Sequence, residues 1–206
     1  MQEIIPLEPG KFYHIYNRGI NGENLFKEER NYDYFLEKYS KYISPVVDTY
    51  AYCLLRNHFH ILVRIKDFGN PKENLKELME KQKWEQYPNI SKQFSHFFNS
   101  YAQSINAANN RTGGLFETSF KRKLVHNDFY FSRAILYIHA NPQKHGFIKD
   151  YRDYPYSSYW SHLSKKNTKL KREEVLEWFG NEEEYVKFHK FTNFMDMKDD
   201  FIIEFD

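Results

Sequence analysis

The chain has 206 residues, of which 41% are hydrophobic, 19% aromatic and 28% charged. This composition excludes a disordered chain and is typical of a soluble domain with a hydrophobic core. The longest apolar stretches, such as Ile61-Leu62-Val63, are far too short to span a membrane, and the first residues do not form a secretory signal. The single cysteine, Cys53, excludes an internal disulfide. We therefore expect a cytoplasmic protein that does not interact with membranes.

The first half of the chain alternates between strand-like and helix-like patterns. We expect, in chain order, a strand, a helix and two strands over residues 11–20, 28–43, 46–56 and 58–66. The last two strands are joined by a tight turn at Arg56 and Asn57. In the last strand, Phe59 and every second residue after it are apolar, which predicts one buried and one polar face, broken only by Leu62.

The second half of the chain is richer in helices. We expect a polar excursion around a short helix, a long helix, a basic strand and another helix over residues 67–90, 91–109, 115–125 and 127–141. Pro142 is expected to end the last of these helices. Two short helices near residues 173–179 and 182–191 follow an irregular aromatic stretch.

The order of these elements predicts the fold class. A strand, a helix, two strands, a helix and a strand form the split βαβ arrangement of a ferredoxin-like α+β fold with an antiparallel sheet. Both long helices should cover one face of that sheet and leave the other face free for polar chemistry.

Charge is distributed unevenly around a net value of +2. Residues 111–172 carry 13 basic and 4 acidic side chains, whereas residues 173–206 carry 3 basic and 11 acidic ones. In the basic segment, aromatic residues such as Phe120 and Tyr130 lie between the basic ones. This pattern is typical of a nucleic-acid-binding surface, and a solvated charged face is the simpler alternative.

Two histidines on the last predicted strand of the first half are a candidate metal clamp. His58 and His60 are separated by one residue, so both imidazoles project from the same, polar face. Two nitrogens placed in this way can reach one metal ion, although a pair of surface histidines is the more common meaning of this spacing. A third ligand has to come from elsewhere in the chain.

The helix over residues 127–141 offers that ligand and a nucleophile. Tyr137 and Asn141 are four residues apart and share one face of the helix. The carbonyl oxygen of Asn141 suits a hard ion such as Mg²⁺ or Mn²⁺, and the phenol of Tyr137 is a candidate nucleophile. Most of the 17 tyrosines are nevertheless expected to be packing or surface residues.

Five motifs in register resemble the HUH single-tyrosine transposases, and most closely the REP-associated tyrosine transposase-like proteins of bacteria. HUH stands for histidine, hydrophobic residue, histidine, here His58-Phe59-His60 within LLRNHFHILVRI. The other motifs are FYHIYNRG (residues 12–19), GLFETSFKRKLV (114–125), LYIHANPQKHG (136–146) and YPYSSY (154–159). Each motif alone is weak, but together they are specific and cover residues 11–160. Glu117 departs from the pattern, in which an amide is expected.

The resemblance implies a role for each candidate residue. His58 and His60 would hold a divalent metal, Mg²⁺ or Mn²⁺, with Asn141 as third ligand, and Tyr137 would be the catalytic nucleophile. The residues expected to contact DNA are Arg18, Arg56, Lys121, Arg122, Lys123 and Arg133.

The resemblance also implies the reaction. The protein would be a DNA transposase, monomeric or homodimeric, that cleaves and rejoins single-stranded or hairpin DNA through a 5′-phosphotyrosine intermediate. Residues 1–160 would form the transposase-like catalytic domain and residues 161–206 an acidic helical C-terminal extension. Residues 173–206 are either a solvated appendage or a segment that folds back on the basic block and competes with DNA.

Two other functions are weighed against this one. A non-catalytic nucleic-acid-binding protein of the same fold, such as a domesticated relative, is the main alternative. RNA-recognition domains share the topology, but they carry stacking aromatics where this chain carries His58 and His60. A phosphoesterase with two histidine-containing strands is disfavoured because the sequence has no clear second motif of this kind.

Overall fold

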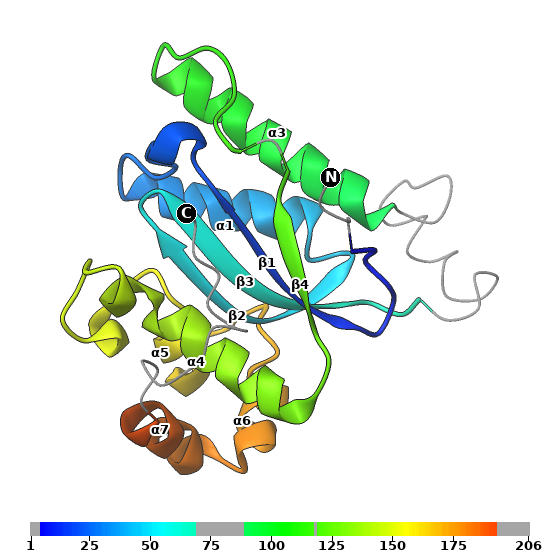
Figure 1. Ribbon diagram of the computed structural model, residues 1–206, viewed down its shortest axis with the longest axis vertical. Helices are drawn as coiled ribbons and strands as arrows, with labels where there is room; N and C mark the ends of the chain where they lie inside the picture. Colours follow the sequence, from blue (N-terminus) through cyan, green and yellow to red (C-terminus); the bar gives the residue numbers. More distant parts are fainter. Residues whose placement is uncertain (1–4, 69–88, 118, 193–206) are drawn as a thin grey trace.

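The computed structural model describes residues 5–68, 89–117 and 119–192. Most of the predicted excursion over residues 67–90 and the end of the acidic C-terminal segment lie outside these residues. A four-stranded antiparallel sheet in the order β2-β3-β1-β4 forms the centre of the molecule (Figure 1). Its strands are β1 (Phe12–Arg18), β2 (Val47–Leu55), β3 (His58–Ile65) and β4 (Lys121–Val125). The predicted ferredoxin-like α+β class is confirmed.

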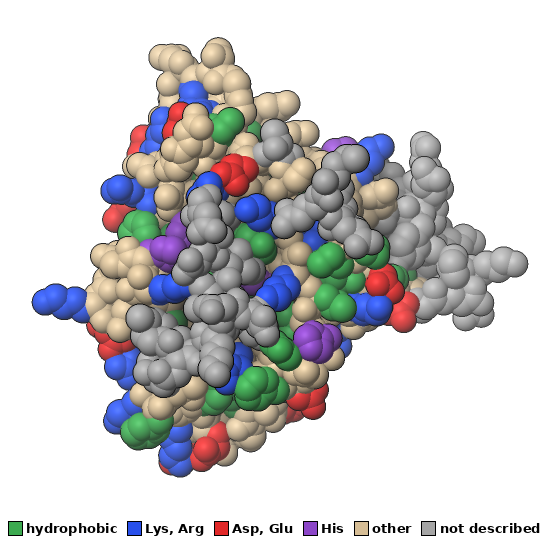
Figure 2. Space-filling model, in the orientation of Figure 1, with side chains coloured by type: hydrophobic (Ala, Val, Ile, Leu, Met, Phe, Trp, Pro, Cys, Tyr) green, Lys and Arg blue, Asp and Glu red, His purple; other side chains and the backbone are tan. Residues whose placement is uncertain are grey.

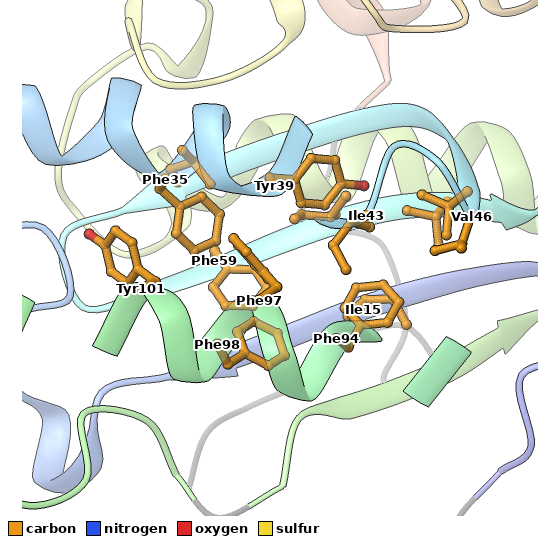
Figure 3. Packing of buried hydrophobic residues seen from close by; sticks show 14 of the residues in the cluster. Ile15, Phe35, Tyr39, Ile43, Val46, Phe59, Phe94, Phe97, Phe98 and Tyr101 are labelled. Atoms are coloured by element: carbon orange, nitrogen blue, oxygen red, sulfur yellow. The ribbon is translucent and has the colours of Figure 1, made fainter. Parts of the chain in front are cut away.

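Two long helices cover one face of the sheet, as expected. They are α1 (Arg30–Tyr42) and α3 (Ile90–Ala108), which lie side by side in Figure 1. Their inner sides are rich in aromatic residues, and Figure 3 shows Phe35 of α1 and Phe97 of α3 directed towards Phe59 of the sheet. The ring centres of Phe35 and Phe59 are 5.2 Å apart. The apolar side of β3 therefore faces this core.

The opposite face of the sheet is covered too, and our expectation that it stays free of helices is wrong. Helix α4 (Asp128–Lys144) packs on it, mostly over β2 (Figure 1). The reason is that β2 is apolar on both sides: Ala51, Cys53 and Leu55 are buried against α4 together with Leu62 of β3. The part of this face formed by β1, β4 and the start of β3 is polar.

Two element boundaries differ from the predicted ones. Strand β4 begins at Lys121 instead of residue 115, because Leu115 and Phe116 turn into the first core and only Phe116 makes a bridge, to Gly19. Helix α4 continues through Pro142 to Lys144. Proline removes one N–H from the ladder, and in the last turn this loss is small because the next bond, from His145 N–H to the Asn141 carbonyl (2.9 Å), is kept.

The C-terminal helices belong to the fold. The short elements η1 (Ile20–Gly22), η2 (Tyr151–Asp153) and α5 (Tyr159–Leu163) are connectors, and α6 (Arg172–Phe179) and α7 (Glu182–Phe191) follow. Val175 and Tyr185 are completely buried in the core beneath α4. Interpreting this region as a solvated appendage is therefore wrong for α6 and α7. No helix among the described residues is long and apolar enough to cross a bilayer.

Candidate active site

The polar part of the second sheet face carries three histidines. His58 and His60 of β3 are buried, with ring centres 5.2 Å apart. The β1–β3 register adds His14, which projects from the same face as His60 and is also buried. His14 Nε2 lies 2.9 Å from His60 Nδ1, which is a hydrogen bond. The strands therefore gather the imidazoles through alternation and register alone.

In both histidines that are candidate metal ligands, the Nδ1 atom takes part in a hydrogen bond. His58 Nδ1–H donates to Asn57 Oδ1 at 2.8 Å, and His60 Nδ1 is bonded to His14. A partner at Nδ1 fixes the tautomer and the ring orientation and makes Nε2 the atom that would bind a metal. This is the hydrogen-bonding pattern that surrounds metal-ligating histidines.

Burial keeps these imidazoles neutral. It lowers the pKa of His14 and of His58 to about 3, and it lowers the pKa of His60 well below its usual value. The neighbouring Lys123 lowers the pKa of His14 further. Neutral imidazole is the form that coordinates a metal, so the electrostatics of the site fit a metal centre near pH 7.

Helix α4 brings Tyr137 against these histidines. The centre of its ring lies 5.7 Å from that of His60 and 5.8 Å from that of His14, edge-on to both. The Lys144 ammonium, two helical turns further on, lies 5.5 Å from the centre of the Tyr137 ring. Asn127 caps the start of the helix by accepting a hydrogen bond from the Tyr130 N–H. The Tyr137 side chain is only 4% exposed.

Asn141 supplies the observation that points to a ligand. Its Nδ2 donates to the Tyr137 carbonyl at 2.7 Å, which orients the amide. Its Oδ1 is buried and has no hydrogen-bond partner. A buried oxygen without a donor costs free energy unless a cation or water satisfies it. No three His, Cys, Asp or Glu side chains of the described segments are grouped to hold a metal.

The basic residues predicted to contact DNA fall into three groups. Lys121 and Lys123 pair in register with Tyr16 and His14, so they lie on the face that carries the histidines. Arg122 projects to the opposite face, where it donates to Ser91 Oγ at 3.0 Å. Figure 2 shows Lys and Arg side chains on the face over β4 and α4, with most visible Asp and Glu side chains near its margin.

The remaining basic residues lie around this region. Arg18 forms an ion pair with Glu117, which explains a carboxylate where the motif leads us to expect an amide. Arg56 is exposed in the β2–β3 turn. Arg133 of α4 lies over the ring of Phe129, 4.7 Å from its centre. The predicted residues thus do not form one continuous strip.

Known proteins share both sequence and fold with this chain, although no family model matches it. A protein of Haemophilus influenzae named "Putative REP-associated tyrosine transposase" is 27% identical over 112 residues, which are 54% of this chain and 58% of that protein. A solved structure of a REP-associated tyrosine transposase bound to a REP hairpin has the same fold, with a TM-score of 0.57. That match covers 80% of this chain and 86% of the other, at 14% identity.

The chain is thus similar in sequence to a protein named as a REP-associated tyrosine transposase, and it shares its fold with a second protein of that name. The resemblance inferred from the five motifs is confirmed by these matches. The match spans less than two thirds of the curated REP-associated tyrosine transposase, and the structural match, at 14% identity, shows the fold alone. The roles of His58, His60, Tyr137 and Asn141 stay predictions.

Several residues of this site were not predicted from the sequence, among them His145, whose ring centre lies 4.8 Å from that of His58. His14 and Tyr16 lie in the motif FYHIYNRG, and their alternation on a strand would have placed them on one face. Their contact with His60 depends on the β1–β3 register, which one sequence does not specify. Lys144 was missed because we expected the helix to end before it.

Proposed function

We propose that the protein is a DNA transposase that depends on a divalent metal and cleaves and rejoins single-stranded or hairpin DNA through a covalent 5′-phosphotyrosine intermediate. The observation that carries this proposal is the meeting of the Tyr137 ring with His60, one helical turn from the partnerless oxygen of Asn141. The fold shared with a protein bound to a REP hairpin supports DNA as the substrate.

His58, His60 and Asn141 are the residues that would hold Mg²⁺ or Mn²⁺. Two neutral imidazoles and an amide oxygen are donors that such ions accept. When bound, the ion supplies Lewis acidity that polarises a non-bridging oxygen of the scissile phosphate. Asn57 and His14 would hold the two imidazoles in orientation, since each bonds the ring atom Nδ1.

Tyr137 performs the bond exchange in this proposal. Its phenol loses its proton and its oxygen bonds to phosphorus, while the bond from phosphorus to the 3′ oxygen breaks and that oxygen takes up a proton. The number of phosphodiester bonds is conserved, so a second 3′-OH can reverse the step and join a new end without ATP. In this proposal the Lys144 ammonium, which lies 5.5 Å from the centre of the Tyr137 ring, would bind the phosphate.

The site has to open before DNA can enter. Tyr137, His60 and Asn141 are all buried, so a phosphate reaches them only when neighbouring side chains move. This closure is the observation that favours the alternative, a non-catalytic nucleic-acid-binding protein of the same fold. The two functions differ in one product, the covalent adduct.

A labelled hairpin oligonucleotide pool with randomised single-stranded flanks tests the proposal. Incubation with Mn²⁺ or Mg²⁺ and analysis on a denaturing gel should show a protein–DNA adduct. Tyr137→Phe should form no adduct, whereas Tyr16→Phe should retain it, because Tyr16 also contacts the His60 ring but is not the proposed nucleophile. Binding of the pool without an adduct from any variant would favour the alternative.

A further inference from the structure

A groove of about 1280 Å³ lies between the outward side of α3 and residues 113–117 and 119–122. We call it the α3 groove. Its α3 wall carries the hydroxyl and amide side chains of Ser91, Ser95, Asn99, Gln103 and Asn106, together with Phe98 and Ala102. The opposite wall includes Phe116, Phe120, Lys121 and Arg122, and also Glu117, which is paired with Arg18.

The composition of α3 is unusual for a surface helix. Lys92 is the one charged residue among its 19, although 28% of the whole chain is charged. Ser91, Ser95 and Asn99 are four residues apart and therefore form one stripe along the groove. Exposed helix faces usually carry charged residues. Within this stripe Ser91 Oγ accepts a hydrogen bond from Arg122, and the Ser95 hydroxyl donates to the Ser91 carbonyl. An uncharged stripe with further donors and acceptors, such as the Asn99 amide, suits a ligand that offers hydrogen-bonding edges.

Phe98, Phe116 and Phe120 bring rings to the same groove. Phe98 is buried at its base, and its ring centre lies 5.0 Å from that of Phe116 and 5.6 Å from that of Phe120. The Arg122 guanidinium lies 4.3 Å from the centre of the Phe120 ring, so it supplies charge together with a flat surface. Aromatic rings beside cations are the means by which proteins stack unpaired bases.

The α3 groove adjoins the candidate active site. Tyr16 and Asn17 of β1 line the groove. The Tyr16 ring also stacks on His60, with ring centres 5.8 Å apart and an angle of 22° between the planes. A flexible strand lying in the groove therefore approaches the histidines at one end.

We infer that the α3 groove binds the unpaired DNA segment that adjoins the scissile phosphate. The inference rests on the proposed function and adds the part of the substrate that the groove would take. Amide and hydroxyl groups can bond base edges, which in unpaired DNA are open, and the rings can stack on bases. A duplex would be bound mainly through basic side chains that contact its phosphates. Among the described residues that line this groove, only Lys121 and Arg122 are basic.

A matched pair of variants tests this inference. Asn99→Asp places a negative charge inside the groove, whereas Gln93→Glu places the same charge on α3 outside it. The probes are a fluorescent single-stranded 20-mer of randomised sequence and a blunt duplex of the same length. We expect Asn99→Asp to weaken single-strand binding about tenfold and duplex binding less than about twofold, and Gln93→Glu to change neither by more than about twofold.

Photocrosslinking locates the strand directly. Single-stranded DNA containing 5-bromodeoxyuridine should crosslink to peptides from residues 91–106 or 113–122. Crosslinks found only elsewhere, or equal effects of the two variants, would overturn the inference. The adduct assay separates this failure from that of the proposed function. An adduct at Tyr137 without groove crosslinks would overturn the inference and support the proposed function. Groove crosslinks without an adduct would support single-strand binding in the groove and contradict the proposed function.

Discussion

Two groups of buried histidines lie on opposite sides of α4. They differ in whether the polar atoms around them are all hydrogen-bonded within the protein. The site cluster consists of His14, His58 and His60, and the Tyr137 ring packs against two of them. The histidine relay consists of Ser158, His139 and His189, and it connects α4 with α7 and the segment before α5. Tyr137 and His139 are two residues apart, so their side chains leave the helix in nearly opposite directions.

Each hydrogen bond in the relay has a defined direction. His189 Nδ1–H donates to the Tyr185 carbonyl at 2.8 Å, so His189 Nε2 accepts from His139 Nδ1–H at 3.0 Å. His139 Nε2 then accepts from the Ser158 hydroxyl at 2.8 Å, and Ser158 Oγ accepts from the Tyr52 N–H at 2.9 Å. The chain of bonds begins and ends at backbone groups.

The comparison shows why burial alone does not identify a functional histidine. Burial lowers the pKa values of His60 and His139 in the same direction, so titration does not distinguish the two groups. The relay uses its ring nitrogens within the fold and has a structural role. The site cluster instead meets the ring of Tyr137, and one helical turn after Tyr137 the fold leaves Asn141 Oδ1 without a hydrogen-bond partner.

Removing an imidazole from the site cluster should have the largest effect. We expect His60→Ala to weaken Mn²⁺ binding by more than about 100-fold, because only two of the three proposed ligands remain to coordinate the ion. Electron paramagnetic resonance of free Mn²⁺ measures this directly. Unchanged Mn²⁺ binding by His60→Ala would show that the site cluster holds no metal.

Removing an imidazole from the relay should lower the stability of the protein and leave its Mn²⁺ affinity unchanged. We expect His139→Ala to lower the free energy of unfolding by about 2–4 kcal/mol, because it leaves a cavity and two polar atoms without partners. Urea denaturation measures the loss. Mn²⁺ affinity should be that of the unchanged protein at temperatures where the variant is folded. Loss of Mn²⁺ binding without loss of stability would remove the distinction between the two groups.

The relay should also make stability depend on pH. Burial lowers the pKa of His189 to about 4, so the unfolded state takes up a proton first as the pH falls below about 6.5. The contribution is complete above pH 6.5, and it is lost by about 1.4 kcal/mol per pH unit as the pH falls towards 4. Urea denaturation at pH 7 and pH 5 should show a shallower dependence for His189→Gln. Equal dependence in both proteins would exclude this contribution.

The smallest effect on Mn²⁺ binding is expected for changes at His14, which orients the proposed ligand His60. His14→Leu removes the partner of His60 Nδ1 and should weaken Mn²⁺ binding by about tenfold. His14→Gln, which can still accept this hydrogen bond, should restore most of the affinity. Calorimetric titration with Mn²⁺ compares the variants. If leucine and glutamine weaken binding equally, His14 acts through packing.

The sequence predicted those parts of the site that depend on local spacing. His58 and His60 follow from strand alternation, and Tyr137 and Asn141 from the four-residue repeat of a helix. His14 could not be predicted because its contact with His60 depends on the pairing of two strands 46 residues apart. The fold class followed from the order of elements, whereas the covering of the second face depended on how apolar β2 is on both sides.

Anomalous diffraction from a crystal soaked in Mn²⁺ tests the central claim most directly, because it locates the ion without relying on activity. We expect one strong peak about 2.1–2.3 Å from Nε2 of His58, Nε2 of His60 and Oδ1 of Asn141. A peak at the relay or elsewhere, with these three atoms at distances too long for coordination, would contradict it.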